Sequence, residues 1–257
     1  MTLNYPKKSN GMYIIRKDQF DDIATAVLSE YAPQNLQRPM PLDIDYFISD
    51  CLYITQIYRY LSYNAAVLGM MAFGDVEVPC LDSMFNPGKL AVAEGTMLVD
   101  SSLMGHESLP RNRFTKAHEV SHWILHRCYH SPDHKDYDLR TAKTRYIACR
   151  KDAIERPRYG SYKVWTENDW EEWQADRLGA SLLMPRDTFT EAAHDAFRHN
   201  DVRHGYLVKG QNMASYIGAV EEISGKFVVS KKAAEIRLQQ LGMLFDSESE
   251  VYNRYYR

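Results

Sequence analysis

Residues 113–126 read RFTKAHEVSHWILH, in which three residues separate two histidines and a glutamate directly follows the first histidine. Small and apolar side chains recur at helical spacing along one side of this stretch: Phe114, Ala117, Ser121 and Ile124. Asn112 precedes the stretch and offers the side-chain oxygen that caps many helices. We therefore predict a helix over 113–126 with Asn112 as its N-cap.

The spacing of the polar residues in this helix is typical of a metal site. His118 and His122 lie four residues apart, so their imidazoles share one face about 6 Å apart and can bind one ion. Zinc favours nitrogen ligands in a tetrahedral shell, and a catalytic site leaves one position to water. Glu119 projects beside the ion, where it can take a proton from that water. The same letters also occur by chance on ordinary helices, so the flanking context matters.

Two imidazoles require a third protein ligand. His126 lies about 12 Å along the helix from His118 and cannot share its ion. A histidine ten residues after the first is also missing, because Cys128 stands there. We expect His130 and His134 to be loop or surface histidines.

A second predicted helix supplies the better ligand. It begins at Thr166, whose side chain can cap the amide of Asp169, and it ends before Pro185. Glu172 and Asp176 lie one turn apart on it. We predict that Glu172 is the third metal ligand and that Asp176 accepts the free N–H of a ligand imidazole.

Two neighbours on this second helix have other predicted roles. Gly179 continues the same face and would let the two helices approach closely. Glu171 is expected to be a solvated acidic position near the helix N-terminus, where negative charge is favourable.

Taken together, these motifs resemble the ImmA/IrrE family of metallopeptidases. The likeness spans roughly residues 40–245 and rests on four stretches: 95–100 (GTMLVD), 113–126, 172–176 (EWQAD) and 182–185 (LLMP). The resemblance implies a zinc endopeptidase of bacteria, phages and mobile elements that cleaves a helix-turn-helix repressor and so acts as an anti-repressor.

Individual positions match the family's site. His118, His122 and Glu172 match its metal ligands, and Glu119 matches its catalytic glutamate. Residues 177–179 (RLG) depart from the more usual aromatic-Ala at that point, which puts the local packing in doubt but not the ligands.

Composition limits the class of protein. The chain has 257 residues, 45% hydrophobic and 25% charged, which is ordinary for a globular protein. A net charge of −3 gives no overall attraction to nucleic acid or to anionic membranes. No signal peptide and no apolar run near the roughly 20 residues of a membrane span is apparent, so we expect a cytoplasmic protein. Four irregularly spaced cysteines predict reduced, mostly buried thiols.

The predicted fold class is α+β, a mainly helical zinc-peptidase domain. Helices are expected near residues 20–31 and from Pro41, and strands within 65–81 and 89–99 form a small sheet before the HExxH helix. Residues 131–168 are expected to be a mobile excursion with at most a short strand. The predicted divisions are an N-terminal helical extension, the peptidase domain, a helix-turn-helix-like segment and a flexible tail: residues 1–38, 39–195, 196–245 and 246–257.

The C-terminal segment resembles a helix-turn-helix between residues 213 and 244. It carries a local basic excess that phosphate contacts would need: Lys226, Lys231, Lys232 and Arg237. Its apolar residues equally suit a packed hairpin, and we expect a structural or partner-docking role rather than direct DNA binding.

The sequence thus predicts a zinc-dependent endopeptidase that hydrolyses a peptide bond in a regulatory protein, with a transcriptional repressor as its expected partner. The competing hypothesis is a regulatory or DNA-binding protein whose zinc is not catalytic and that sequesters its partner, which a closed site of four protein ligands would favour. Two histidines and a carboxylate also suit iron, manganese or cobalt. The residue that stabilises the oxyanion stays open between Tyr129, His126 and residues of the excursion.

Overall fold

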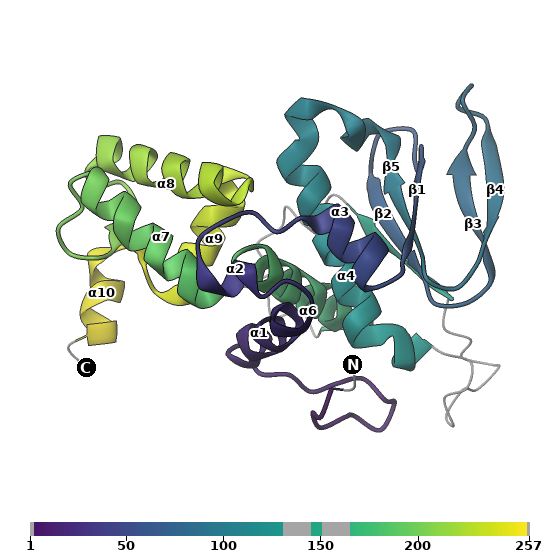
Figure 1. Ribbon diagram of the computed structural model, residues 1–257, viewed down its shortest axis with the longest axis horizontal. Helices are drawn as coiled ribbons and strands as arrows, with labels where there is room; N and C mark the ends of the chain where they lie inside the picture. The colour runs from purple at the N-terminus through teal and green to yellow at the C-terminus, as the bar shows by residue number, and fades with distance from the viewer. Residues whose placement is uncertain (1–2, 131–144, 151–164, 256–257) are drawn as a thin grey trace. The chain divides into compact units, whose positions relative to one another are not determined.

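The computed structural model describes residues 3–130, 145–150 and 165–255 (Figure 1). Its helices and small sheets form the α+β class that the sequence predicts, with a sheet whose strands mostly precede the HExxH helix. None of the described helices is long and apolar enough to span a bilayer.

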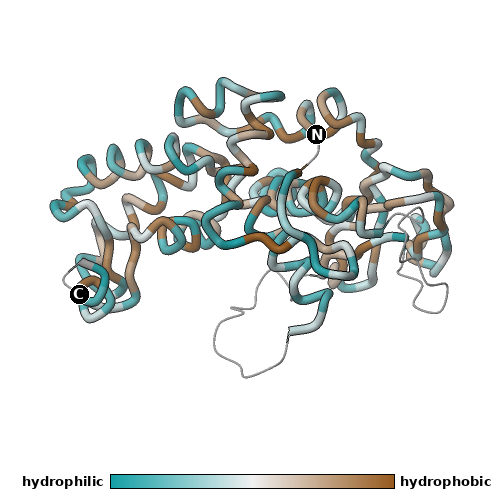
Figure 2. The backbone as a smooth tube through the Cα atoms, turned by 90° about the horizontal axis from the view of Figure 1, so that it is seen from below, coloured by the Kyte–Doolittle hydropathy of each residue, from teal (hydrophilic) through white to brown (hydrophobic). Residues whose placement is uncertain are grey.

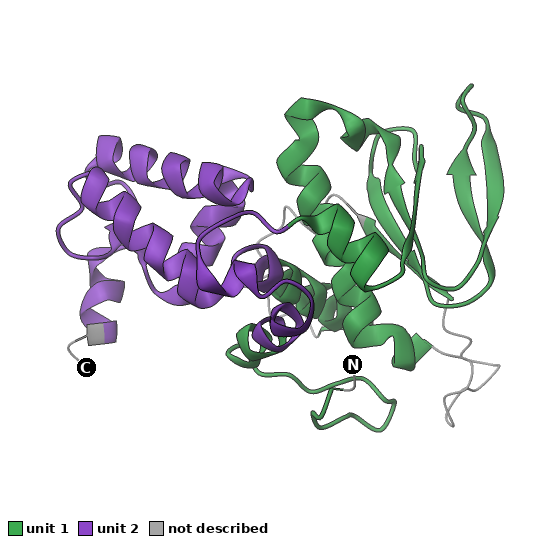
Figure 3. Ribbon diagram, in the orientation of Figure 1, with its two compact units in different colours: residues 1–23, 43–179 green, residues 24–42, 180–257 purple. Residues whose placement is uncertain are grey.

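The chain divides into two compact units, shown in Figure 3: unit 1 comprises residues 1–23 and 43–179, and unit 2 comprises residues 24–42 and 180–257. These boundaries differ from the predicted divisions because an N-terminal segment belongs with the C-terminal helices. Within unit 2, the hydroxyl of Thr188 donates to the carbonyl of Asn35 at 3.1 Å.

The main sheet of unit 1 has the strand order β1-β5-β2-β6: β1 Thr55–Arg59, β5 Thr96–Asp100, β2 Val67–Ala72 and β6 Tyr146–Arg150. Strand β1 is parallel to β5, whereas β2 is antiparallel to both of its neighbours. Every residue of β5 is buried, and its three central residues are apolar, as expected of a strand with neighbours on both sides. A separate antiparallel hairpin joins β3 (Val76–Leu81) to β4 (Pro87–Val92).

The strands predicted within 65–81 and 89–99 are confirmed as β2 to β5. Strand β1 is not among the predicted elements. Strand β6 is the short strand expected within the excursion at residues 131–168. Residues 131–144 and 151–164 of this excursion lie outside the described residues.

Helix α4 runs from Leu109 to His130 and packs against β2 (Figure 1). It begins one turn earlier than predicted because Pro110 suits the first turn of a helix, where no intrahelical N–H bond is needed. Asn112 is therefore not the N-cap. Its side-chain amide instead donates to the carbonyl of Leu103 at 3.0 Å.

The remaining helices near the site follow the predictions more closely. Helix α6 (Glu167–Leu183) begins after Thr166, whose hydroxyl accepts from the amide of Asp169 at 3.2 Å. Helix α1 (Gln19–Tyr31) is confirmed. The helix expected from Pro41 is the short α3 (Ile44–Tyr46), which continues into the π-helical turn η1 (Phe47–Cys51). The 3-10 turns η2 (Ser101–Met104) and η3 (His106–Ser108) lead into α4.

Unit 2 is mostly helical, and its elements are α2 Gln34–Gln37, α7 Arg186–His199, β7 Leu207–Val208, α8 Met213–Phe227, α9 Lys231–Leu241, β8 Leu244–Phe245 and α10 Glu248–Tyr255. Hydrophilic and hydrophobic stretches alternate along its backbone (Figure 2). In α7 the buried positions recur three or four residues apart, as expected of a helix with one apolar face.

The predicted pair of helices in the C-terminal segment is present as α8 and α9. Ser230 caps α9, since its hydroxyl accepts from the amide of Ala233 at 3.1 Å. Basic side chains of this C-terminal segment have partners within unit 2. Lys231 pairs with Glu221, and Nε of Arg237, which is buried, donates to the carbonyl of Met184 at 3.0 Å.

The tail predicted to be flexible contains a helix, α10. Val251 is 7% exposed and packs with Val208 and Phe245, so one apolar side chain anchors this helix. The carboxylate of Glu250 also accepts from the amide of Asp246 at 3.0 Å, which supports the first turn.

Candidate metal centre

Three of the predicted site residues converge inside unit 1. His118 and His122 of α4 are fully buried, and Glu172 of α6 is 4% exposed. The Nε2 atoms of the two imidazoles lie 2.9 Å apart. The two carboxylate oxygens of Glu172 face one nitrogen each: Oε2 lies 3.5 Å from Nε2 of His118, and Oε1 lies 3.5 Å from Nε2 of His122. The structure therefore brings together a buried group that could hold a metal ion.

The two helices can meet because a glycine lies at their crossing. A Cβ atom added to Gly179 would be 3.2 Å from the carbonyl carbon of Ala117 and 3.2 Å from the backbone nitrogen of His118. Gly179 thus has the predicted role of allowing a close approach. The carbonyl oxygen of Ala117 is also close, at 3.3 Å from the added Cβ.

Asp176 orients the first imidazole. Its Oδ1 lies 2.9 Å from Nδ1 of His118, so the carboxylate accepts the Nδ1–H and leaves Nε2 directed to the centre. Burial alone lowers the pKa of His118. The charge and hydrogen bonds of Cys149, Asp176 and Glu172 nevertheless raise that pKa well above its ordinary value.

A longer chain of neutral groups orients the second imidazole. The amide nitrogen of Gln174 donates to the carbonyl of Tyr13 at 2.9 Å, so its Oε1 is the atom that accepts from Nε2–H of His126, at 3.0 Å. Nδ1 of His126 must then be an acceptor, and it lies 3.0 Å from Nδ1 of His122. His122 donates its Nδ1–H there and keeps a lone pair on Nε2. Burial lowers the pKa of His122 to about 4 and that of His126 to about 3, so both rings are neutral.

This arrangement fits a divalent cation. Two imidazole lone pairs and a carboxylate facing one another at 2.9 to 3.5 Å repel unless a positive charge lies between them. Zinc–nitrogen bonds of about 2.0 Å in a tetrahedral shell would place the two nitrogens about 3.3 Å apart, close to the separation found. The donor set itself suits zinc, iron, manganese or cobalt alike.

Glu119 lies on the side of α4 that faces β2. It is fully buried, and neither carboxylate oxygen has a hydrogen-bond partner among the described residues. Burial raises its pKa to about 8. A Cβ atom on Gly69 of β2 would come within 2.5 Å of Oε1 of Glu119 and 2.9 Å of Cγ2 of Thr115. The carboxylate is therefore held by the shape of its surroundings, with the bare backbone of Gly69 leaving space for it.

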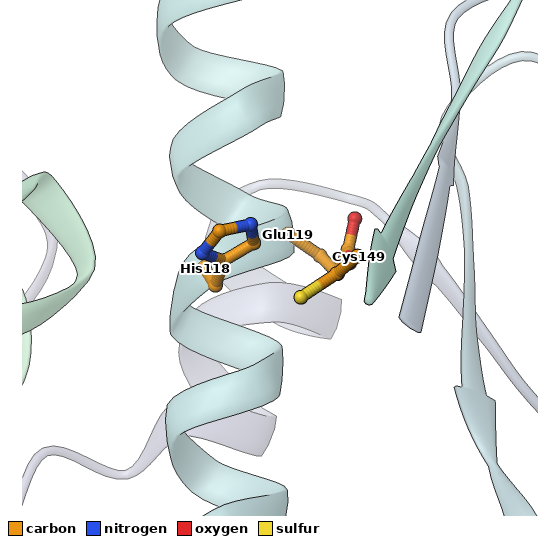
Figure 4. A group of neighbouring side chains, drawn as sticks. All are labelled: His118, Glu119 and Cys149. Carbon is orange, nitrogen blue, oxygen red and sulfur yellow. The ribbon is translucent and has the colours of Figure 1, made fainter. Parts of the chain in front are cut away.

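Cys149 of β6 completes a second group of ligand atoms that the sequence did not indicate. Its sulfur, a nitrogen of His118 and an oxygen of Glu119 all lie within 4.8 Å of one another (Figure 4). Burial raises the pKa of the Cys149 thiol to about 12. All four cysteines fall in the described part of the chain and are free, but Cys149 alone among them is fully buried. No local signal marks this position, because it depends on the pairing of β6 with β2.

Two neighbours of the site differ from their predicted surroundings. His130 and Glu171 are buried instead of solvated, and Nε2 of His130 lies 2.6 Å from Oε1 of Glu171. The reason is that α4 continues to His130, one turn beyond His126 on the side that faces α6. Histidines at every fourth position from 118 to 130 are the signal that could have predicted this buried face. His134 lies outside the described residues.

The residues considered for oxyanion stabilisation are already engaged where the structure describes them. Both ring nitrogens of His126 have partners, as given above. The hydroxyl of Tyr129 donates to Oε2 of Glu167 at 2.7 Å. Most residues of the excursion lie outside the described part of the chain.

No protein-family model matches the sequence, and no curated protein matches it significantly. The resemblance to ImmA/IrrE metallopeptidases thus stays a prediction from the motifs, and the metal centre rests on its geometry.

Proposed function

We propose that the chain is a zinc-dependent endopeptidase that hydrolyses a peptide bond in a regulatory protein, with Glu119 as general base. One observation carries the proposal: three buried electron-pair donors, His118, His122 and Glu172, converge beside a buried carboxylate without a hydrogen-bond partner in the described structure. A structural metal site has no use for such a carboxylate, whereas hydrolysis requires one.

The roles of the groups follow from their positions. A divalent cation at the centre would acidify a water molecule and polarise the scissile carbonyl. Glu119 would accept the proton from the attacking water and return it to the leaving amine. Asp176 and the chain from His126 to Gln174 would keep the imidazoles oriented.

A helix-turn-helix repressor is the proposed substrate, and this part of the proposal rests on the motif resemblance. A protein partner also agrees with the ion pairs of the C-terminal helices. Lys231 pairs with Glu221, and Lys232 pairs with Glu235. Arg237 is buried, so fewer basic side chains remain for phosphate contacts.

A second candidate function is a regulatory protein that binds metal without turnover and sequesters its partner. The proximity of Cys149 favours it, because a fourth protein ligand would fill the position that hydrolysis leaves to water. The two functions make opposite predictions about product formation.

The test incubates the zinc-loaded full chain with a candidate helix-turn-helix repressor from the same genome and searches for fragments by mass spectrometry. Wild type should cut at a single site or a few sites. Glu119→Gln should keep the zinc and lose about 10²- to 10⁴-fold in rate. Glu77→Gln, an exposed glutamate of β3, is the matched control and should cleave normally.

Each outcome has a defined meaning. Unchanged cleavage by Glu119→Gln would contradict its role as general base. A stable one-to-one complex of repressor and zinc-loaded wild type, without fragments, would favour sequestration.

A further inference from the structure

Cys149 is placed at the metal centre by two separate features of the fold. In the pairing of β2 with β6, Cys149 lies opposite Gly69, and residues opposite each other in a sheet project from the same face. A Cβ on Gly69 would point at Glu119, so the side chain of Cys149 must point to the same place. The positions of the atoms agree, since the sulfur lies within 4.8 Å of ligand atoms of both His118 and Glu119 (Figure 4).

A second observation points to a ligand at this position. Both oxygens of Glu119 are fully buried without a hydrogen-bond partner among the described residues, in the same group of atoms as the sulfur. His118 belongs both to this group and to the group with His122 and Glu172. The two groups therefore share one imidazole, and an ion held by His118 lies next to the thiol.

We propose that Cys149 is a further metal ligand, whose thiolate closes the centre in a resting state. This inference rests on the proposed metal centre. When Cys149 binds, its thiol proton is released to solvent, the sulfur forms a bond to the ion, and the water in the fourth position leaves. Opening reverses the exchange: the sulfur takes up a proton and water returns, with no change in oxidation state.

The exchange requires the Cys149 side chain to move toward the centre, because its sulfur forms a group with His118 and Glu119 and not with His122 and Glu172. Bonds of about 2.3 Å to sulfur and about 2.0 Å to nitrogen place the two ligand atoms about 3.5 Å apart in a tetrahedral shell. The sulfur and this nitrogen of His118 lie within 4.8 Å of each other, so the sulfur would have to come closer to the nitrogen by up to about 1.3 Å. In the closed state Glu119 has no water to deprotonate, so the same centre would have a latent four-ligand form and an active three-ligand form.

The test uses Co²⁺ as a probe of the full chain, because thiolate ligation gives cobalt an intense near-ultraviolet charge-transfer absorption that nitrogen and oxygen ligands do not. Metal-free wild type is titrated with Co²⁺ alone. The spectrum should show this absorption together with the visible bands of a four-coordinate ion. Cys149→Ser should keep the visible bands, lose the charge-transfer absorption and hydrolyse substrate faster than wild type.

Two controls separate Cys149 from the other thiols. Cys80→Ser changes a half-buried strand cysteine and should leave the absorption unchanged. A variant with Cys51, Cys80 and Cys128 all replaced by serine keeps Cys149 as its one cysteine and should show the full absorption, so the test does not depend on a variant of Cys149 folding.

Contrary results are distinct. Co²⁺ binding without the charge-transfer absorption, or an absorption that survives Cys149→Ser, would overturn the inference while the three-ligand centre stands. Failure of wild type to bind Co²⁺ would overturn the proposed metal centre itself.

Discussion

The two sides of helix α4 are built differently. On the side toward α6, the histidines are fixed by hydrogen bonds in three pairs: His118 with Asp176, His126 with Gln174 and His130 with Glu171. On the side toward β2, both oxygens of Glu119 lack a hydrogen-bond partner among the described residues, and the carboxylate is confined by Gly69. The difference teaches that hydrogen bonds orient the imidazoles, whereas packing alone positions the Glu119 carboxylate. Under the proposed function, metal affinity would depend mainly on the side toward α6 and reaction rate mainly on the side toward β2.

The largest effect is expected from removing the carboxylate ligand. Glu172→Gln replaces an anion 3.5 Å from each Nε2 atom with a neutral amide. Zinc affinity should fall by more than about 100-fold, because removing a group that only hydrogen-bonds a metal ligand already costs about 10- to 100-fold. Competition against a chelating dye measures this. Glu171→Gln is the matched control, since it changes the adjacent carboxylate that binds His130, and an equal loss in both variants would contradict the assignment of Glu172.

A change on the opposite side, at the space that Glu119 occupies, should affect the rate far more than the metal affinity. Gly69→Ala puts a methyl group 2.5 Å from Oε1 of Glu119, so the carboxylate must move by about 1 Å. Hydrolysis should fall on the order of 10²-fold while zinc affinity stays unchanged. Steady-state cleavage and dye competition on the same preparation separate these effects.

Gly105→Ala is the control for this substitution, because a Cβ there meets nothing within 4 Å and the backbone φ is −70°. Weaker zinc binding in Gly69→Ala would show that the two sides of α4 are not independent.

The outer partner of His118 should give the next effect. Asp176→Asn keeps an oxygen that can accept from Nδ1–H but removes its charge, so Nε2 becomes a weaker donor to the ion. Zinc affinity should fall about 10- to 100-fold, with the rate of the zinc-saturated enzyme less affected. Unchanged affinity would mean that Asp176 has no part in holding the metal.

The sequence could predict those features of the centre that depend on residues close together in the chain. His118 and His122 needed only the four-residue repeat of a helix, and Glu172 and Asp176 needed the same repeat on a second helix. The fold class and the strands within 65–99 also follow from local patterns. These features depend on periodicity along a few turns, which is written in the chain itself.

Other features depend on contacts between distant segments. The position of Cys149 is set by its register against Gly69, which lies 80 residues earlier in the chain. Tyr13 supports Gln174 across a separation of 161 residues. The burial of His130 depends on α4 continuing to this residue, beyond the predicted end at His126. Neither pairing register nor helix end is determined by composition nearby, so these residues could not be placed from the sequence.

The smallest expected effect concerns the crossing that brings the two helices together. In Gly179→Ala the new methyl group would lie 3.2 Å from backbone atoms of Ala117 and His118, which can yield only if the helices separate by a few tenths of an ångström. Overpacking of this kind costs about 1–3 kcal/mol, and the better helix propensity of alanine offsets about 1 kcal/mol. The net loss of roughly 1 kcal/mol should lower Tm by about 2–4 °C in a thermal melt.

Gly225→Ala in α8 is the control. A Cβ there meets nothing within 4 Å, so this variant gains only the better helix propensity of alanine and its Tm should rise. If both variants were stabilised alike, the helices at the metal centre would not be in close contact at Gly179, and the convergence of Glu172 with the two imidazoles would lose its structural basis.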